Sequence, residues 1–117
     1  MSAISASLHA IDLGPVEAIP LGEGRSCVVN GREIAVFRTR EGEVLAVQAR
    51  CPHRGGPLAD GLVGGGSVVC PLHAYRFDLH SGRPLGRECP ALVTYTVEAT
   101  SDGRLLLLLT PRSQAVA

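Results

Sequence analysis

The sequence predicts an all-β protein that forms a single domain. Asn30-Gly31 and Asp102-Gly103 each lie between two apolar runs, which is the pattern of a β-hairpin. Helical periodicity is almost absent, and 14 glycines and 8 prolines among 117 residues indicate many turns. A chain of this length buries one core but not two, so residues 1–117 are expected to form one domain.

The first expected strands lie on either side of Asn30-Gly31. Residues 28–29 and 34–37 form the arms of a hairpin, because Asn-Gly supplies the two residues of positive φ that a type I′ turn needs. A turn at residues 41–43 then leads into an apolar strand at 44–48. This strand runs directly towards Cys51.

The second hairpin lies near the C-terminus. Residues 93–97 and 104–109 are its expected arms, with residues 101–103 as the turn. Residues 111–117 are expected to form a flexible tail, because chain ends with few apolar residues have little to hold them.

Between these hairpins lies a segment of different composition, about residues 51–90. It contains five of the prolines, the pair Gly55-Gly56 and the glycine run at 64–66. Residues 67–69 are too short to be stable alone and would form an arm between two loops. We expect a small metal-binding subdomain that is inserted into a β-sandwich or barrel.

The bulk composition excludes some classes of partner. The formal net charge is zero, so nothing predicts binding to nucleic acid or to an anionic membrane. The N-terminal residues show no secretory pattern, and the longest apolar run, 105–109, is too short to span a bilayer. We therefore expect a cytoplasmic protein.

The four cysteines divide into two pairs. Cys51 and Cys70 each lie within three residues of a histidine, whereas Cys27 and Cys89 do not. Two disulfides of a secreted scaffold are the alternative, and the missing secretory pattern argues against them. We assign Cys51 and Cys70 to a metal and interpret Cys27 and Cys89 as ordinary buried or half-buried thiols.

The candidate metal ligands come in two mixed pairs, Cys51 with His53 and Cys70 with His73. A single structural zinc ion accepts such a quartet, although zinc fingers usually take both cysteines from one loop and both histidines from another. Two thiolates and two imidazoles from two loops also suit a binuclear iron–sulfur cluster, because each loop can reach both irons.

The residues around these pairs are more specific than the pairs alone. The stretch Cys51-Pro52-His53-Arg54-Gly55-Gly56-Pro57-Leu58 precedes Cys70-Pro71-Leu72-His73, with Phe77-Asp78 beyond it. Together these stretches resemble the Rieske family over about residues 8–110. The resemblance implies a Rieske-type fold of small antiparallel sheets, with the cluster-binding subdomain inserted and one [2Fe–2S] cluster per chain at an exposed tip.

The resemblance also implies roles around the cluster. Gly55 and Gly56 are suited to bring backbone N–H groups close to the cluster sulfides, and Pro57 and Pro71 would stiffen the ligand loops. High-potential members carry hydroxyl side chains at the positions of Tyr75 and Phe77. Phe77 has no hydroxyl and Tyr75 is expected to point elsewhere, so we predict a low-potential centre.

Electron transfer is the function that the resemblance implies, and two partner classes fit it. The stretch from Cys70 to Leu79, with Ala74 where ferredoxins usually have glycine, is similar to the small subunit of assimilatory NAD(P)H-dependent nitrite reductases, whose partner is a sirohaem-bearing large subunit. The alternative is the Rieske ferredoxin of an aromatic-ring dioxygenase, which works between a flavin reductase and an oxygenase. An arginine-rich collar around the ligand pairs would suit an acidic partner, although solvated arginines without a partner explain it equally well: Arg50, Arg54, Arg76, Arg83 and Arg87.

Overall fold

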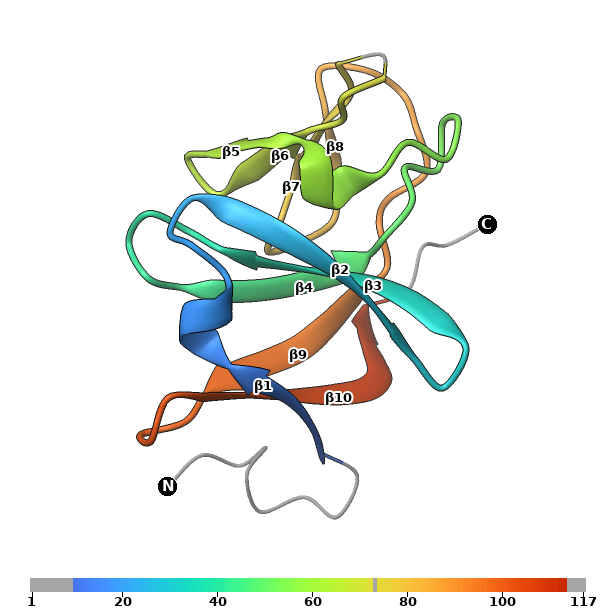
Figure 1. Cartoon of the computed structure of the whole chain (residues 1–117). Helices are drawn as coiled ribbons and strands as arrows, with labels where there is room; N and C mark the ends of the chain where they lie inside the picture. Colours follow the sequence, from blue (N-terminus) through green and yellow to red (C-terminus); the bar gives the residue numbers. More distant parts are fainter. Residues whose placement is uncertain (1–9, 73, 114–117) are drawn as a thin grey trace.

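The computed structural model describes residues 10–72 and 74–113 and is shown in Figure 1. The described residues form two antiparallel sheets. The larger has six strands in the order β1-β10-β9-β4-β3-β2 and the smaller has four in the order β5-β6-β7-β8. The elements are β1 Ala10–Pro15, η1 Val16–Ala18, β2 Glu23–Val29, β3 Arg32–Arg38, β4 Val44–Gln48, η2 Leu58–Asp60, β5 Leu62–Gly64, β6 Ser67–Val69, β7 Arg76–Asp78, β8 Pro84–Leu85, β9 Thr94–Ala99 and β10 Arg104–Ser113.

The all-β prediction is confirmed, and so is the first hairpin. Asn30 and Gly31 connect β2 to β3 with φ values of 51° and 80°, as a type I′ turn requires. The strand expected at residues 44–48 is β4, and it pairs with β3 from Ile34↔Gln48 to Arg38↔Val44.

The central strands β3 and β4 are buried on both faces. Ala35, Phe37 and Val47 pack into one core together with residues of the small sheet. Ile34 and Val36 face a second core with β9 and β10. Because successive side chains of a strand point to opposite faces, a nearly continuous apolar run is what such a doubly covered strand needs. In Figure 1 the small sheet accordingly lies above β2–β4, with β9, β10 and β1 below.

The small sheet was only partly predicted. β6 matches the arm expected at residues 67–69, but β5, β7 and β8 were not predicted from the sequence. Each has only two or three residues, which is too short for a period-2 pattern to be recognised. They are stabilised by pairing with one another, and the sheet forms the framework of the segment about 51–90.

The C-terminal strand is longer than expected. β10 continues to Ser113, and Pro111 and Ser113 lie opposite Tyr95 and Thr94 of β9. Residues 111–113, which were expected to belong to a flexible tail, are therefore paired with β9. The strand continues past its predicted end at residue 109 because Thr94 and Tyr95 of β9 lie opposite. Residues 114–117 lie outside the described residues.

The helical segments of the described chain are the short 3₁₀ turns η1 and η2. No helix in this part of the chain has the length and apolar character needed to cross a membrane.

Candidate metal centre

The first candidate ligand loop, residues 51–56, follows β4 and closes on itself. The Cys51 N–H donates to the Gly56 carbonyl at 2.9 Å, and the Gly55 N–H donates to the Cys51 carbonyl at 2.7 Å. Gln48 anchors the start of the loop: its Nε2 donates to the Arg50 carbonyl at 2.8 Å, and its Oε1 accepts the Val93 N–H at 2.7 Å. These bonds fix the Cys51 backbone relative to the large sheet.

The second candidate loop, residues 70–75, connects β6 to β7 and repeats the same pattern. The Cys70 N–H donates to the Tyr75 carbonyl at 2.7 Å, and the Ala74 N–H donates to the Cys70 carbonyl at 3.1 Å. The fifth residue of each loop has positive φ, 74° at Gly55 and 59° at Ala74. The two loops thus share the same pair of backbone hydrogen bonds and a left-handed fifth residue.

Both cysteines are buried and lie close together. Cys51 and Cys70 are each 2% exposed and belong to the same core. Burial raises the pKa of the Cys51 thiol, and the neighbouring Cys70 raises it further, while the backbone N–H groups of His53 and Arg54 donate to its sulfur and lower it. Such N–H donors stabilise a thiolate, which is the form that binds a metal.

Gly56 allows the two loops to approach. A Cβ atom at Gly56 would lie 2.7 Å from the Cys70 Sγ and 3.0 Å from the Leu72 Cγ, so only glycine fits. Gly55 has open space around its Cα, and its N–H is already bonded to Cys51. That N–H therefore closes the turn, and the role of Gly55 as a donor to the cluster stays a prediction. Gly56 lies against the Cys70 sulfur, and its lack of a Cβ atom lets the backbone approach a cluster bound there.

His53 is exposed and stacks on Tyr75. The ring centroids are 4.1 Å apart and the planes meet at 29°. The Arg87 guanidinium carbon lies 4.7 Å from the Tyr75 ring centroid. His73 lies outside the described residues. Among the residues that are described, no three His, Cys, Asp or Glu side chains converge on one metal ion.

The remaining predicted site residues surround these loops. Phe77 is fully buried in the core that contains Cys51 and Cys70. Pro57, at the end of the first loop, forms an isolated bridge with Arg50 and precedes η2, whereas Pro71 is exposed. Both positions are compatible with the expected role of the two prolines, which is to limit the backbone freedom of the candidate ligand loops.

Cys89 lies nearer to the site than its sequence position indicates. It is half-buried against the core of Cys51 and Cys70, and burial raises its pKa, with the neighbouring Cys70 adding to the rise. The sequence carries no local sign of this, since no histidine lies within three residues of Cys89. Cys27 instead packs against the other core.

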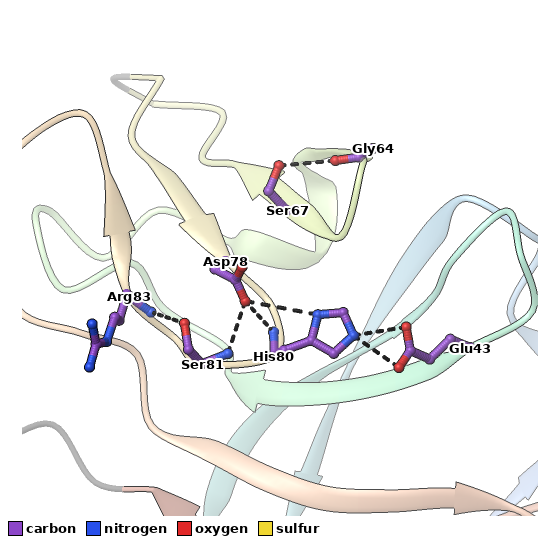
Figure 2. Close-up of polar contacts among 7 residues, drawn as sticks. All are labelled: Glu43, Gly64, Ser67, Asp78, His80, Ser81 and Arg83. Atoms are coloured by element: carbon purple, nitrogen blue, oxygen red, sulfur yellow. Dashed lines mark hydrogen bonds and ion pairs between the residues drawn. The ribbon is translucent and has the colours of Figure 1, made fainter.

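A polar network fixes the turn after β7, as Figure 2 shows. Asp78 Oδ1 accepts the N–H groups of His80 and Ser81 at 2.8 and 2.9 Å, and these bonds hold the pKa of Asp78 below its usual value. The exposed His80 ring lies 2.9 Å from the Glu43 carboxylate. This network joins the small sheet to the turn between β3 and β4, an interaction that sequence patterns do not reveal.

The arginine collar is partly engaged in structural contacts. Arg50 pairs with Glu33 at 3.3 Å and reaches the Gly55 carbonyl at 3.4 Å. Arg87 covers Tyr75, while Arg54 and Arg76 are exposed beside the two candidate loops. Leu72 of the second candidate loop is likewise exposed, at 52%.

Several known proteins are similar to this chain. The ferredoxin component of the naphthalene 1,2-dioxygenase/salicylate 5-hydroxylase systems of a Ralstonia species is 39% identical over 75 residues, which cover 64% of this chain and 71% of that protein. The 4β-methylsterol monooxygenase of Methylococcus capsulatus is 52% identical over 48 residues, but they cover 41% of this chain and only 13% of the monooxygenase.

Solved structures show the same fold. A protein described as an NADH-dependent nitrite reductase small subunit from Mycobacterium tuberculosis superposes with a TM-score of 0.78 and 25% identity, covering 91% of this chain and 96% of that one. The ferredoxin of carbazole 1,9a-dioxygenase from Nocardioides aromaticivorans superposes with a TM-score of 0.77 and 24% identity, covering 85% and 96%.

The family comparison agrees with the geometry of the two loops. The model of the Rieske [2Fe-2S] domain matches residues 9–96, which include both cysteine–histidine pairs. The chain therefore belongs to the Rieske [2Fe–2S] domain family, and its cofactor is one [2Fe–2S] cluster.

Proposed function

We propose that this chain is a low-potential electron carrier in which Cys51, His53, Cys70 and His73 hold one [2Fe–2S] cluster. The observation that carries the proposal is the pair of loops with matching hydrogen bonds, which bring the buried side chains of Cys51 and Cys70 together, with Gly56 against the Cys70 sulfur. The cluster supplies one-electron redox chemistry when bound, and four protein ligands leave no open position for substrate.

The cysteines and the histidines would have different roles in cluster binding and electron transfer. Cys51 and Cys70 would bind one iron through thiolates inside the core, while His53 and His73 would bind the other towards solvent. His53 is exposed, so its imidazole edge offers a partner an approach to the centre while the sulfurs stay buried. We assign the electron exit to this edge.

The low potential is supported by the apolar surroundings of the buried cysteines. Phe77 is 0% exposed in their core and carries no hydroxyl that could donate to sulfur. Hydrogen bonds to sulfur raise the potential, and Rieske centres span roughly −150 to +300 mV. We expect Phe77→Tyr to raise the midpoint potential in a protein-film or solution titration, with Phe37→Tyr, in the same core but on β3, as the control. An unchanged potential in Phe77→Tyr would remove this support.

Two redox partners are candidates. The small subunit of an assimilatory nitrite reductase is supported by two solved structures with that description, at 25% and 27% identity over 91% and 86% of this chain. The ferredoxin component of an aromatic-ring dioxygenase is supported by the 39% identity to the Ralstonia protein. Affinity purification from the source cells separates them: a sirohaem protein supports the first, and a flavin reductase or oxygenase the second.

The decisive experiment is an anaerobic potentiometric titration followed by electron paramagnetic resonance. A rhombic signal with a low average g, appearing only at low potential, is the expected result. A silent sample with one zinc per chain would contradict the proposal. The cytoplasmic location expected from the sequence is part of the same proposal, and cell fractionation tests it.

A further inference from the structure

Three side chains from three separate loops form a stack beside the candidate centre. His53 belongs to the first ligand loop, Tyr75 closes the second, and Arg87 lies between β8 and β9. The Tyr75 ring lies 4.1 Å from the His53 ring and 4.7 Å from the Arg87 guanidinium carbon. No motif in the sequence connects these three positions.

Tyr75 is well placed to link the two ligand loops. Its carbonyl accepts the Cys70 N–H at 2.7 Å, so its backbone is fixed relative to a candidate ligand of one loop. Its ring packs partly buried against the core of both cysteines and contacts the imidazole of the other loop. A shift of either loop would therefore break the stack or the hydrogen bond.

Arg87 completes the arrangement from a third segment. A guanidinium within about 6 Å of a ring centroid is attracted by the negative face of the aromatic ring. Arg87 thereby holds Tyr75 in the rotamer that reaches His53. This contact depends on the aromatic ring and not on the tyrosine hydroxyl.

We propose that Tyr75 is a positioning residue for His53, and that Arg87 supports it by closing the stack. The inference rests on the proposed function, because it takes His53 as a ligand. Groups that hold a ligating imidazole set its ring orientation and strengthen metal binding. The stack should therefore determine the orientation of the His53 ring on its iron and slow the loss of the cluster.

The test compares four variants of the purified holoprotein. Tyr75→Leu removes the aromatic face, Tyr75→Phe keeps it, and Arg87→Gln removes the cation. Arg83→Gln is the control, because Arg83 is an exposed arginine just before β8 whose backbone N–H donates to the Ser81 hydroxyl. The readouts are the g values of the reduced centre and the rate of cluster loss to an iron chelator.

We expect Tyr75→Leu to shift the g values and to lose its cluster about fivefold faster, the factor that corresponds to the loss of one aromatic contact. Arg87→Gln should act in the same direction but less, while Tyr75→Phe and Arg83→Gln match the wild type. Unchanged g values and cluster loss in Tyr75→Leu would overturn the inference.

Two further outcomes are also decisive. If Tyr75→Leu does not fold, the test rests on Arg87→Gln. Arg87 is exposed, so its substitution leaves the core intact. Wild-type g values in Arg87→Gln would then overturn the inference. A wild-type protein that holds no iron would refute the proposed function before any variant is compared. The two failures are thus distinguishable.

Discussion

At the scale of single residues, the fifth position of each candidate ligand loop has a left-handed backbone. The first loop has glycine there, but the second has Ala74 with φ of 59°. A left-handed conformation costs a residue with a Cβ atom roughly 1–2 kcal/mol, while a glycine adds roughly 0.4–1 kcal/mol of entropy to the unfolded chain. The strain at Ala74 is the larger effect.

Ala74→Gly should therefore stabilise the protein. We expect a gain of about 0.5 kcal/mol, which corresponds to a rise of about 2 °C or more in the midpoint temperature of thermal unfolding. The matched control is Ala99→Gly, at the exposed end of β9, which should lower that temperature because glycine weakens a strand. A fall in both variants would show that the positive φ of Ala74 carries no strain.

Gly56 is the residue whose replacement should damage the site most directly. The methyl group of Gly56→Ala would lie 2.7 Å from the Cys70 Sγ, so one ligand loop must move. We expect the purified variant to hold less than about half the wild-type iron and acid-labile sulfide, since a Cβ at that distance cannot be accommodated without a shift. Gly64→Ala, in open space on β5, is the control and should keep its full content.

At the scale of elements, the turn after β7 depends on one carboxylate. The N–H groups of Ser81 and His80 donate to the Asp78 carboxylate and hold its pKa below its usual value. A group whose pKa is depressed in the folded state stabilises the fold above its unfolded pKa, and this stabilisation is lost as the pH falls through the folded pKa. The contribution of Asp78 is thus present at neutral pH and disappears in acid.

Asp78→Asn keeps the shape of the side chain but removes its charge. We expect the variant to unfold at a lower temperature than the wild type at pH 7, and the difference to shrink below about pH 4. Circular dichroism melts across this range measure it. Asp60→Asn is the control, because Asp60 is exposed and its side chain makes no hydrogen bond within the described part of the chain. A difference that persists unchanged at pH 2 would contradict the assignment.

At the scale of the whole molecule, the small sheet packs against β3 and β4 of the large sheet, and the two sheets form one core between them. The core beneath the ligand loops takes Phe37 and Val47 from the large sheet and Val68, Phe77 and Leu79 from the small sheet and the turn that follows it. Neither sheet encloses this core alone. We therefore expect the cluster-binding segment and the large sheet to unfold as one cooperative unit.

Phe37→Leu tests this cooperativity. The substitution should destabilise the protein by about 1–2 kcal/mol, because it removes part of a fully buried ring. Loss of visible absorbance from the cluster and loss of β-sheet circular dichroism should shift together to lower temperature. Val28→Ala, 69% exposed on the neighbouring strand β2, should change neither. Cluster loss that shifts without the sheet signal would show two separate units.

The sequence by itself determined the local features of this protein. Asn30-Gly31 predicts a hairpin because positive φ is a property of the residues in the turn. The cysteine–histidine pairs predict a metal site because ligand type is a property of single side chains, and the stretches around them resemble the Rieske family. The strands of the small sheet escaped prediction, since segments of two or three residues have no readable pattern.

Only the tertiary structure decided how these local parts meet. The fit of Gly56 against Cys70, the stack of Tyr75 on His53 and the approach of Cys89 all join loops that are separate in sequence. Such contacts arise because the shared core of β3, β4 and the small sheet brings the loops together when it packs. The turns and the candidate ligands are therefore determined by local sequence, whereas the residues that contact them are determined by packing of the core.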